Sequence, residues 1–264
     1  MKKYFRIFQN TLLEHEAFKI NFLFWRIRVV ITMLMTYFLW TSVYADSTRL
    51  FNYPKEKILT YSLLLVFIHG FVLSTRIFLI DEEINMGSLS KYLIRPINYF
   101  AFHITKDAAD KIVGLGFSLI ELSVLIILLQ PVLYIQTGIF WITIFYISIV
   151  IAAILYLEII TIISLLTFWI HDTWPLRFLA VILISFLAGS YFPLDILPRK
   201  LFEILIYSPF TYLVFFPLKL YLGDVPQSII IQGITVSIVY LLLFLGFILF
   251  LWKRGLRSYG AEGQ

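Results

Sequence analysis

The sequence contains no cysteine and few charged residues. The absence of cysteine from all 264 residues excludes disulfide bonds, thiolate metal sites and cysteine nucleophiles. Charged residues make up only 14% of the chain and hydrophobic residues 61%, whereas soluble domains average about 25% charged residues. A chain of this composition cannot bury all its apolar surface in one core, so we expect lipid to be the solvent for most of it.

The sequence also lacks the common motifs of nucleotide-binding and hydrolytic sites. No G-x-x-x-x-G-K-[ST] occurs, so the chain cannot hold ATP in a P-loop, and no H-E-x-x-H or G-x-S-x-G occurs either. The four histidines are scattered over different segments: His15, His69, His103 and His171. We therefore expect no catalytic residue, no metal site and no cofactor in this chain.

Six apolar runs are long enough to cross the hydrocarbon core of a membrane, which takes about 20 helical residues. They lie near residues 22–44, 58–80, 111–134, 139–169, 174–192 and 228–252. Cations that flank these runs account for the formal charge of +5, so no nucleic-acid partner is expected. The sequence predicts an all-α polytopic membrane protein with six transmembrane helices, in which residues 1–264 form a single domain.

Residues 1–21 precede the first apolar run and can form an amphipathic helix. An apolar face (Tyr4, Phe5, Phe8 and Leu12) opposes a polar face (Lys3, Arg6, Asn10 and Glu14). Such an interfacial helix would lie along the cytoplasmic leaflet; a polar tail with a few aromatic residues is the alternative. No small-residue cleavage site follows the first apolar run, so we expect this end to be retained.

The distribution of lysine and arginine predicts the orientation in the membrane. With the N-terminus inside, fifteen of the 21 basic residues lie on the inner side and the remaining six on the outer side. Inner loops carry an excess of these residues. We therefore expect a multi-pass protein of the cytoplasmic (inner) membrane with both termini in the cytoplasm.

The polar interval of residues 81–110 separates the second and third apolar runs and would then face the cytosol. Its first half carries an acidic cluster, a glycine, two basic residues and a proline: Asp81, Glu82, Glu83, Gly87, Lys91, Arg95 and Pro96. Because the residue before a proline disfavours the α region, Arg95–Pro96 should end one helical arm of a bent loop. We expect this loop to dock onto a soluble partner, with Lys91 and Arg95 as charge partners of the acids; a solvated acidic patch is the alternative.

A second unusual segment, residues 190–227, combines an apolar composition with five of the nine prolines. These are Pro193, Pro198, Pro209, Pro217 and Pro226. Non-helical backbone at membrane depth must be shielded by protein or line a cavity. Two short re-entrant helices that dip in from the outer face, near residues 199–207 and 210–221, would satisfy this condition; one kinked seventh span is the alternative.

Three ionisable residues fall inside the predicted spans: His69, Glu121 and Glu158. Such residues are functional candidates because a charge in the hydrocarbon region is costly. A carboxylate near mid-bilayer could serve a proton relay or a cationic substrate. The alternatives are that a neighbour such as Thr161 satisfies the Glu158 carboxylate and that His69 packs as a neutral group.

The loop sequence carries a resemblance to a known family. The run I-x-x-G-x-L-x-x-x-L-x-x-P-I-N from Ile84 to Asn98 resembles the cytoplasmic loop of type-2 ABC exporter permeases, in particular a largely uncharacterised branch of similar length. Further similarities are F-P-L-D-I-L-P at residues 192–198, F-P-L-K-L-Y-L-G at 216–223 and W-K-R-G-L-R-S-Y-G-A-E-G at 252–263. Together these matches extend over most of the chain.

The resemblance implies a permease that exports a hydrophobic or amphipathic compound by alternating access, along an interface lined by spans two and five. It also implies an interfacial N-terminal helix, a coupling helix between spans two and three, and an outer re-entrant hairpin before span six. The partners would be a separate ABC ATPase subunit that holds ATP and Mg, a second copy or a paralogue of the permease, and membrane lipid. Two other classes stay open: an intramembrane lipid-modifying enzyme built on Glu158 and His69, and a non-transporting receptor or immunity protein.

Overall fold

A computed structural model describes residues 2–17, 19–223 and 225–260, which are helical apart from one short hairpin and the connections. The longer helices are α1 (Lys2–Ala17), α2 (Lys19–Val43), α3 (Lys55–Phe71), α6 (Tyr99–Leu129), α7 (Ile139–Leu165), α8 (Trp174–Leu187) and α11 (Gln227–Ser258). The short helices are α4 (Leu79–Asn85), α5 (Ser90–Leu93), α9 (Arg199–Leu205) and α10 (Phe215–Tyr221). Three 3-10 turns, η1 (Leu166–Phe168), η2 (Leu194–Ile196) and η3 (Pro209–Tyr212), and the antiparallel strands β1 (Arg49–Leu50) and β2 (Tyr53–Pro54) complete the fold.

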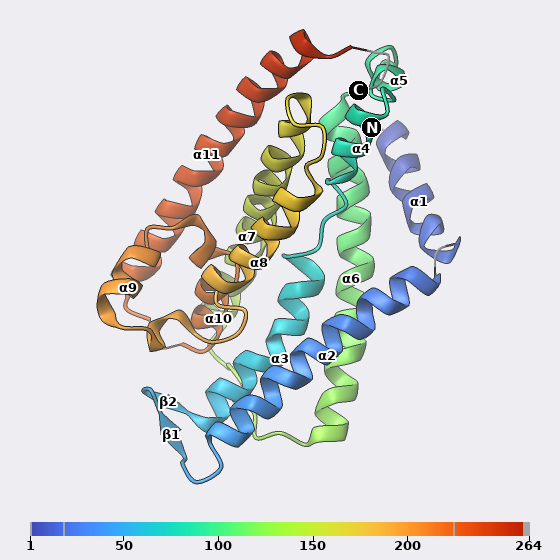
Figure 1. Ribbon diagram of the computed structural model, residues 1–264. Coiled ribbons are helices and arrows are strands. Elements are labelled where there is room, and N and C mark those ends of the chain that lie inside the picture. The colour runs from blue at the N-terminus through green and yellow to red at the C-terminus, as the bar shows by residue number, and fades with distance from the viewer. Residues whose placement is uncertain (1, 18, 224, 261–264) are drawn as a thin grey trace.

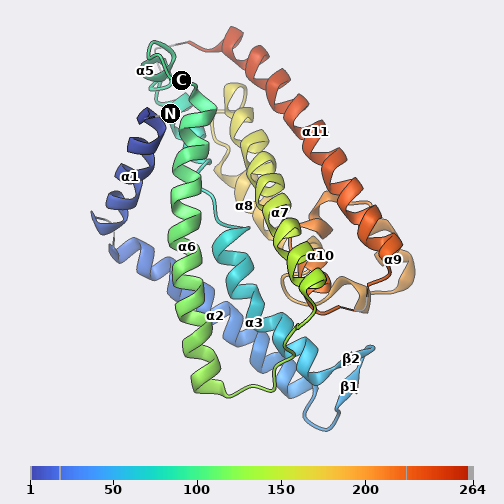
Figure 2. The ribbon, with the colours of Figure 1, turned by 180° about the vertical axis from the view of Figure 1, so that it is seen from behind.

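The helices form an elongated bundle with two different ends (Figure 1). Helices α4 and α5 lie at one end, close to both chain termini, and the β1–β2 hairpin lies at the other. The reverse view shows α6 and α11 on opposite sides of α7 (Figure 2). The architecture is mainly helical, as predicted, and the β1–β2 hairpin is an addition that was not predicted.

Four helices of the described chain are long and apolar enough to cross a membrane: Arg26–Val43, Tyr99–Leu129, Ile139–Phe168 and Gln227–Ser258. They correspond to the first, third, fourth and sixth predicted spans. The fifth predicted span appears as α8, an apolar helix of 14 residues. The second appears as α3, a helix of 17 residues, which at 1.5 Å per residue falls short of a 30 Å hydrocarbon core.

The second predicted span, residues 58–80, is wrong at its C-terminal end. Helix α3 ends at Phe71, and residues 72–78 are non-helical before α4 begins. The Lys111 ammonium of α6 donates hydrogen bonds to the carbonyl oxygens of Phe71 (3.0 Å) and Ser74. A cation at a helix C-terminus satisfies carbonyl groups that have no intrahelical partner, so a side chain from a distant segment stabilises this break.

Helix α6 begins twelve residues before the predicted start at residue 111, so the loop is shorter than predicted. The Asn98 side chain accepts a hydrogen bond from the amide of Ala101 (2.9 Å), which is the usual N-cap arrangement. The polar residues after Asn98 therefore form the first turns of a long helix, and the connection between α3 and α6 ends at Asn98.

Helix α1 packs beside the start of α6. The Lys3 ammonium donates to the carbonyl oxygen of Pro96 (2.7 Å), and the Glu14 carboxylate lies 3.5 Å from the Lys106 ammonium. These contacts at both ends of α1 show that the two helices run in the same direction. The predicted apolar face of α1 is only partly buried against the rest of the chain, since Phe5 is 62% exposed. The position of α1 on a lipid surface stays a prediction.

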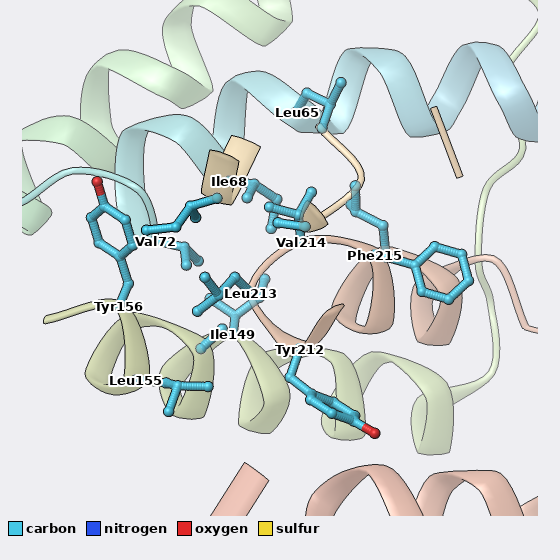
Figure 3. Packing of buried hydrophobic residues seen from close by; sticks show 14 of the residues in the cluster. Leu65, Ile68, Val72, Ile149, Leu155, Tyr156, Tyr212, Leu213, Val214 and Phe215 are labelled. Carbon is cyan, nitrogen blue, oxygen red and sulfur yellow. The ribbon is translucent and has the colours of Figure 1, made fainter. Parts of the chain in front are cut away.

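The apolar core lies where α3, α7 and the segment before α10 meet (Figure 3). Its buried side chains include Leu65, Ile68 and Val72 from the α3 region, Ile149 and Leu155 from α7, and Leu213, Val214 and Phe215. The Phe215 amide donates to the Ala188 carbonyl oxygen (2.9 Å). Protein therefore shields the irregular backbone around Phe215, which is the condition for non-helical chain at membrane depth.

Candidate coupling loop and membrane cavity

Residues 79–98, here called the α4–α5 loop, form a bent element of two short helices. The bend is at Gly87, whose φ of +68° lies in the left-handed region. A residue with a Cβ pays about 1–2 kcal/mol in that conformation. The amide of Leu89 donates to the Glu83 carbonyl oxygen (2.9 Å) across the turn, so the backbone fixes the angle between the two arms.

Asp81 ties the first arm to the beginning of α8. The Arg177 guanidinium donates to the Asp81 carboxylate (2.5 Å), and the Thr173 hydroxyl donates to the same oxygen (3.2 Å). The Asp81 side chain is 8% exposed and the Arg177 side chain 18%. Arg177 also lies over the Phe78 ring, 4.7 Å from its centroid. This buried ion pair joins the loop to a helix whose Arg177 lies 96 residues after Asp81 in the chain.

Glu83 ties the same arm to the start of α6. Its carboxylate accepts a hydrogen bond from the Tyr99 hydroxyl (2.6 Å) and lies 3.1 Å from the His103 Nε2. Burial opposes ionisation of Glu83, but hydrogen bonds from His103 and Tyr99 outweigh it and lower its pKa. Burial and the nearby Glu83 charge raise the pKa of Tyr92 to about 12. Glu82, in contrast, is exposed.

The acids are not paired with Lys91 and Arg95, which corrects the prediction from sequence. Lys91 and Arg95 are exposed, and neither belongs to an ion pair within the described chain. Arg95 instead lies over the Tyr92 ring, 5.9 Å from its centroid. The acids lie before the Gly87 turn and the basic residues after it, so the bend separates them and leaves the acids to α6 and α8.

The second arm contacts the end of α11. The Ser90 amide donates to the Tyr259 hydroxyl (3.3 Å). At the start of α6, the Tyr99 ring stacks on Trp252 with centroids 5.1 Å apart. With Lys3 bound to the Pro96 carbonyl oxygen, the loop thus contacts α1, α8 and α11 by directional interactions.

The tip of the loop is exposed and partly apolar. Ile94 is 85% exposed, Met86 76% and Leu93 46%, and Lys91, Arg95 and Pro96 are exposed beside them. Single exposed apolar residues need no explanation, but three on one short loop that also exposes two cations make the loop a candidate contact surface.

A cavity of about 730 Å³ opens next to this loop, under the break after α3. Most of the break and one face of α8 line it, together with residues of α2, α6 and α7. The lining includes Arg28, Leu73, Ser74, Thr75, Arg76, Phe78, Asp110, Tyr156, Trp174, Arg177, Phe178 and Val181. The break is held to α6 by polar contacts, because Asp107 accepts from the Thr75 hydroxyl (2.5 Å) and Asp110 from the Arg76 guanidinium (2.7 Å). The cavity therefore has charged and apolar walls.

The structure does not bring the three intramembrane candidates together. Glu121 forms an ion pair with Arg26, whose Nε donates to Oε1 (2.6 Å). His69 lines two smaller cavities of about 190 and 10 Å³. The Glu158 Oε2 is buried without a hydrogen-bond partner among the described residues, and Thr161, which could have bound it, donates to the Leu157 carbonyl oxygen (2.7 Å).

No group of histidine and acidic residues suited to a metal ion occurs in the parts of the chain that the structure describes. The ion pairs of Asp81 and Glu121 were not predicted. The sequence did contain a signal for the ion pair of Glu121, because Arg26 and Glu121 are opposite charges inside apolar helices and a buried charge is costly unless it is paired. Spacing alone gave no way to match Asp81 with Arg177.

The proline-rich segment forms two short helices close to the predicted positions, α9 and α10. Its prolines begin or flank these turns: Pro193 precedes η2, Pro198 precedes α9, Pro209 begins η3 and Pro217 lies in the first turn of α10. The segment is fixed to β2, where the Tyr53 hydroxyl donates to Asp195 (2.9 Å) and Lys219 donates to Asp195 (2.7 Å). Burial and the Asp195 charge raise the pKa of Tyr53.

Comparison with known proteins agrees with this architecture. Residues 30–263 match the family described as "ABC-2 family transporter protein". A search of curated proteins finds no match. The family match spans nearly the whole chain, including α2 to α11 and the α4–α5 loop. The chain is therefore a multi-pass membrane protein that belongs to the ABC-2 transporter family.

Proposed function

We propose that the chain is the permease subunit of an ABC exporter, which moves a hydrophobic or amphipathic substrate outward and receives mechanical work through the α4–α5 loop. The observation that supports this proposal is that the α4–α5 loop has an exposed tip and also contacts two of the longer helices. Its tip, with Met86 and Ile94, is exposed, whereas Asp81 and Ser90 contact α8 and α11. A partner that presses on the tip would move two helices at once.

The proposed layout has six spans, with α3 and α8 as short second and fifth spans. Each would be extended at its inner end by non-helical chain, residues 72–78 and 169–173. Helices α9 and α10 would form the outer re-entrant hairpin before α11. Both termini and the α4–α5 loop would lie in the cytoplasm, as the excess of inner basic residues predicts, and the membrane would be the inner one.

The proposed partner is a separate ABC ATPase subunit that holds ATP and Mg, since this chain has no P-loop. The transporter would contain a second permease, either another copy or a paralogue. Helix α8 supports a contact with a second permease, because its side chains Trp174, Phe178 and Phe186 are more than half exposed in the isolated chain.

Co-purification of the chain with its ATPase subunit tests the proposal. Ile94→Asp on the loop tip should abolish binding of the ATPase, because it places a charge in a desolvated contact. Ile135→Asp is the matched control, since Ile135 is 71% exposed in the connection between α6 and α7, away from the loop. Equal ATPase recovery and activity with Ile94→Asp and with the unchanged chain would refute the coupling role.

A further inference from the structure

The large cavity contains one arginine that the described chain leaves without a partner. Arg76 and Arg177, which also line it, bind carboxylates of neighbouring helices. The Arg28 side chain is exposed and forms no ion pair or side-chain hydrogen bond with the residues that the structure describes. Arg28 lies at the start of the apolar span Arg26–Val43, where a charge in a membrane is costly unless an anion compensates it. The open cavity beside Arg28 would admit such an anion from outside the chain.

Arg28 occupies the junction between two cavities. It lines both the cavity of about 730 Å³ and the inner one of about 190 Å³, and the two share Leu73, Tyr156 and Val181 as well. The inner cavity continues past Thr32 to His69. A group bound to Arg28 would therefore lie between the wide opening and the interior of the bundle.

The wall of the wide cavity that α8 forms is apolar and accessible. It is formed by Trp174, Phe178 and Val181 of α8, which are 58%, 56% and 38% exposed. Arginine binds carboxylate and phosphate through two parallel hydrogen bonds. A ligand that uses both walls needs an anionic head and an apolar tail.

We propose that this cavity binds an amphiphile whose anionic phosphate or carboxylate head is held by Arg28 and whose tail lies along α8. This inference rests on the proposed function and specifies its substrate class. Two sources share this chemistry: an anionic lipid of the bilayer, or a separate amphiphile that is exported.

The test measures binding of dodecyl phosphate to the full chain in phosphatidylcholine nanodiscs by calorimetry, with empty nanodiscs subtracted. Arg28→Ala should weaken binding about ten-fold or more, the usual loss for a hydrogen bond to a charged group. Arg28→Lys should bind more tightly than Arg28→Ala but more weakly than the unchanged chain, because lysine keeps the charge and loses the paired hydrogen bonds. Arg254→Ala is the matched control, because Arg254 is exposed on α11 and does not line the cavity.

Three further measurements sharpen the result. Val181→Trp, which narrows the junction, should also weaken binding, and inorganic phosphate, which lacks a tail, should compete at least about ten-fold more weakly than dodecyl phosphate. Phosphatidylglycerol in the nanodisc should displace the probe if the site takes a bilayer lipid; lack of displacement would assign it to a separate amphiphile.

Unchanged binding by Arg28→Ala, or an equal loss with Arg254→Ala, would overturn the proposal, since only long-range attraction to basic residues would then remain. The assay contains no ATPase. Loss of this binding site would therefore leave the coupling role intact, and failure of ATPase co-purification would leave the binding site intact.

Discussion

The ion pair between Asp81 and Arg177 should contribute measurably to the stability of the fold. Arg177 donates to Asp81 over 2.5 Å, and both side chains are largely buried. Removal of one partner leaves the other charge without compensation. We expect Asp81→Asn and Arg177→Met each to lower the free energy of unfolding by about 1.5–3 kcal/mol, the range for hydrogen bonds to charged groups.

A double-mutant cycle isolates this contact from the rest of the site. With both partners replaced, the loss should be smaller than the sum of the single losses, with a coupling energy of about 1–3 kcal/mol. The assay is denaturant unfolding of the purified chain in detergent micelles, followed by circular dichroism. The control is the exposed pair Arg199–Glu203 (91% and 57% exposed side chains), whose coupling should be at most about 1 kcal/mol. Additive losses for Asp81 and Arg177 would refute the argument that this pair joins the loop to α8.

Three further predictions use the same unfolding assay. Gly114→Ala should lower the free energy of unfolding by about 1–3 kcal/mol, because its Cβ would lie 2.5 Å from the Gly70 carbonyl oxygen. Gly116→Ala is the control, since open space surrounds Gly116. Equal effects of the two substitutions would contradict the close packing of α3 on α6. Gly87→Ala should lower the free energy of unfolding by about 1–2 kcal/mol, because Gly87 has a left-handed φ, and it should also lower ATPase coupling. Unchanged stability and coupling in this variant would contradict the role of the Gly87 turn. The pKa of Glu83 in the folded chain is lowered from 4.5, so the Glu83 carboxylate stabilises the fold above that pH and loses this effect as the pH falls below it. Glu83→Gln should therefore reduce the loss of stability in acid. An unchanged dependence of stability on pH in this variant would count against the contact with His103.

The helical architecture could be predicted from sequence because the apolar runs are long and the turn residues clear. The boundaries of the helices beside the α4–α5 loop could not. Residues 72–80 are mostly apolar, and the polar Ser74, Thr75 and Arg76 among them are too few to exclude a continuous span. The bond from Lys111 to the Phe71 carbonyl oxygen, which stabilises the break, joins residues 40 positions apart. Likewise, the polar residues that suggested a loop up to residue 110 face Glu14, Arg76 and other parts of the bundle from within α6.

The α4–α5 loop lies inside the polar interval of the sequence, but neither its bend nor its contacts were predicted. The predicted bend was at Arg95–Pro96, where α5 has already ended at Leu93, whereas the sharp turn of the structure is at Gly87, whose φ is +68°. The partners of Asp81 and Glu83 depend on tertiary packing, which spacing along the chain does not encode. The cavity around Arg28 was not predicted either, because its walls come from α2, α6, α7, α8 and the break after α3.

Labelling of single cysteines at the loop tip tests the central claim most directly. The chain has no cysteine of its own, so Met86→Cys and Ile94→Cys each introduce one reactive thiol at an exposed position. The account predicts that a membrane-impermeant maleimide modifies both in inside-out vesicles only, that the bound ATPase subunit protects them, and that a short crosslinker joins them to that subunit. Labelling from the outer side, or equal labelling with and without the ATPase, would contradict it.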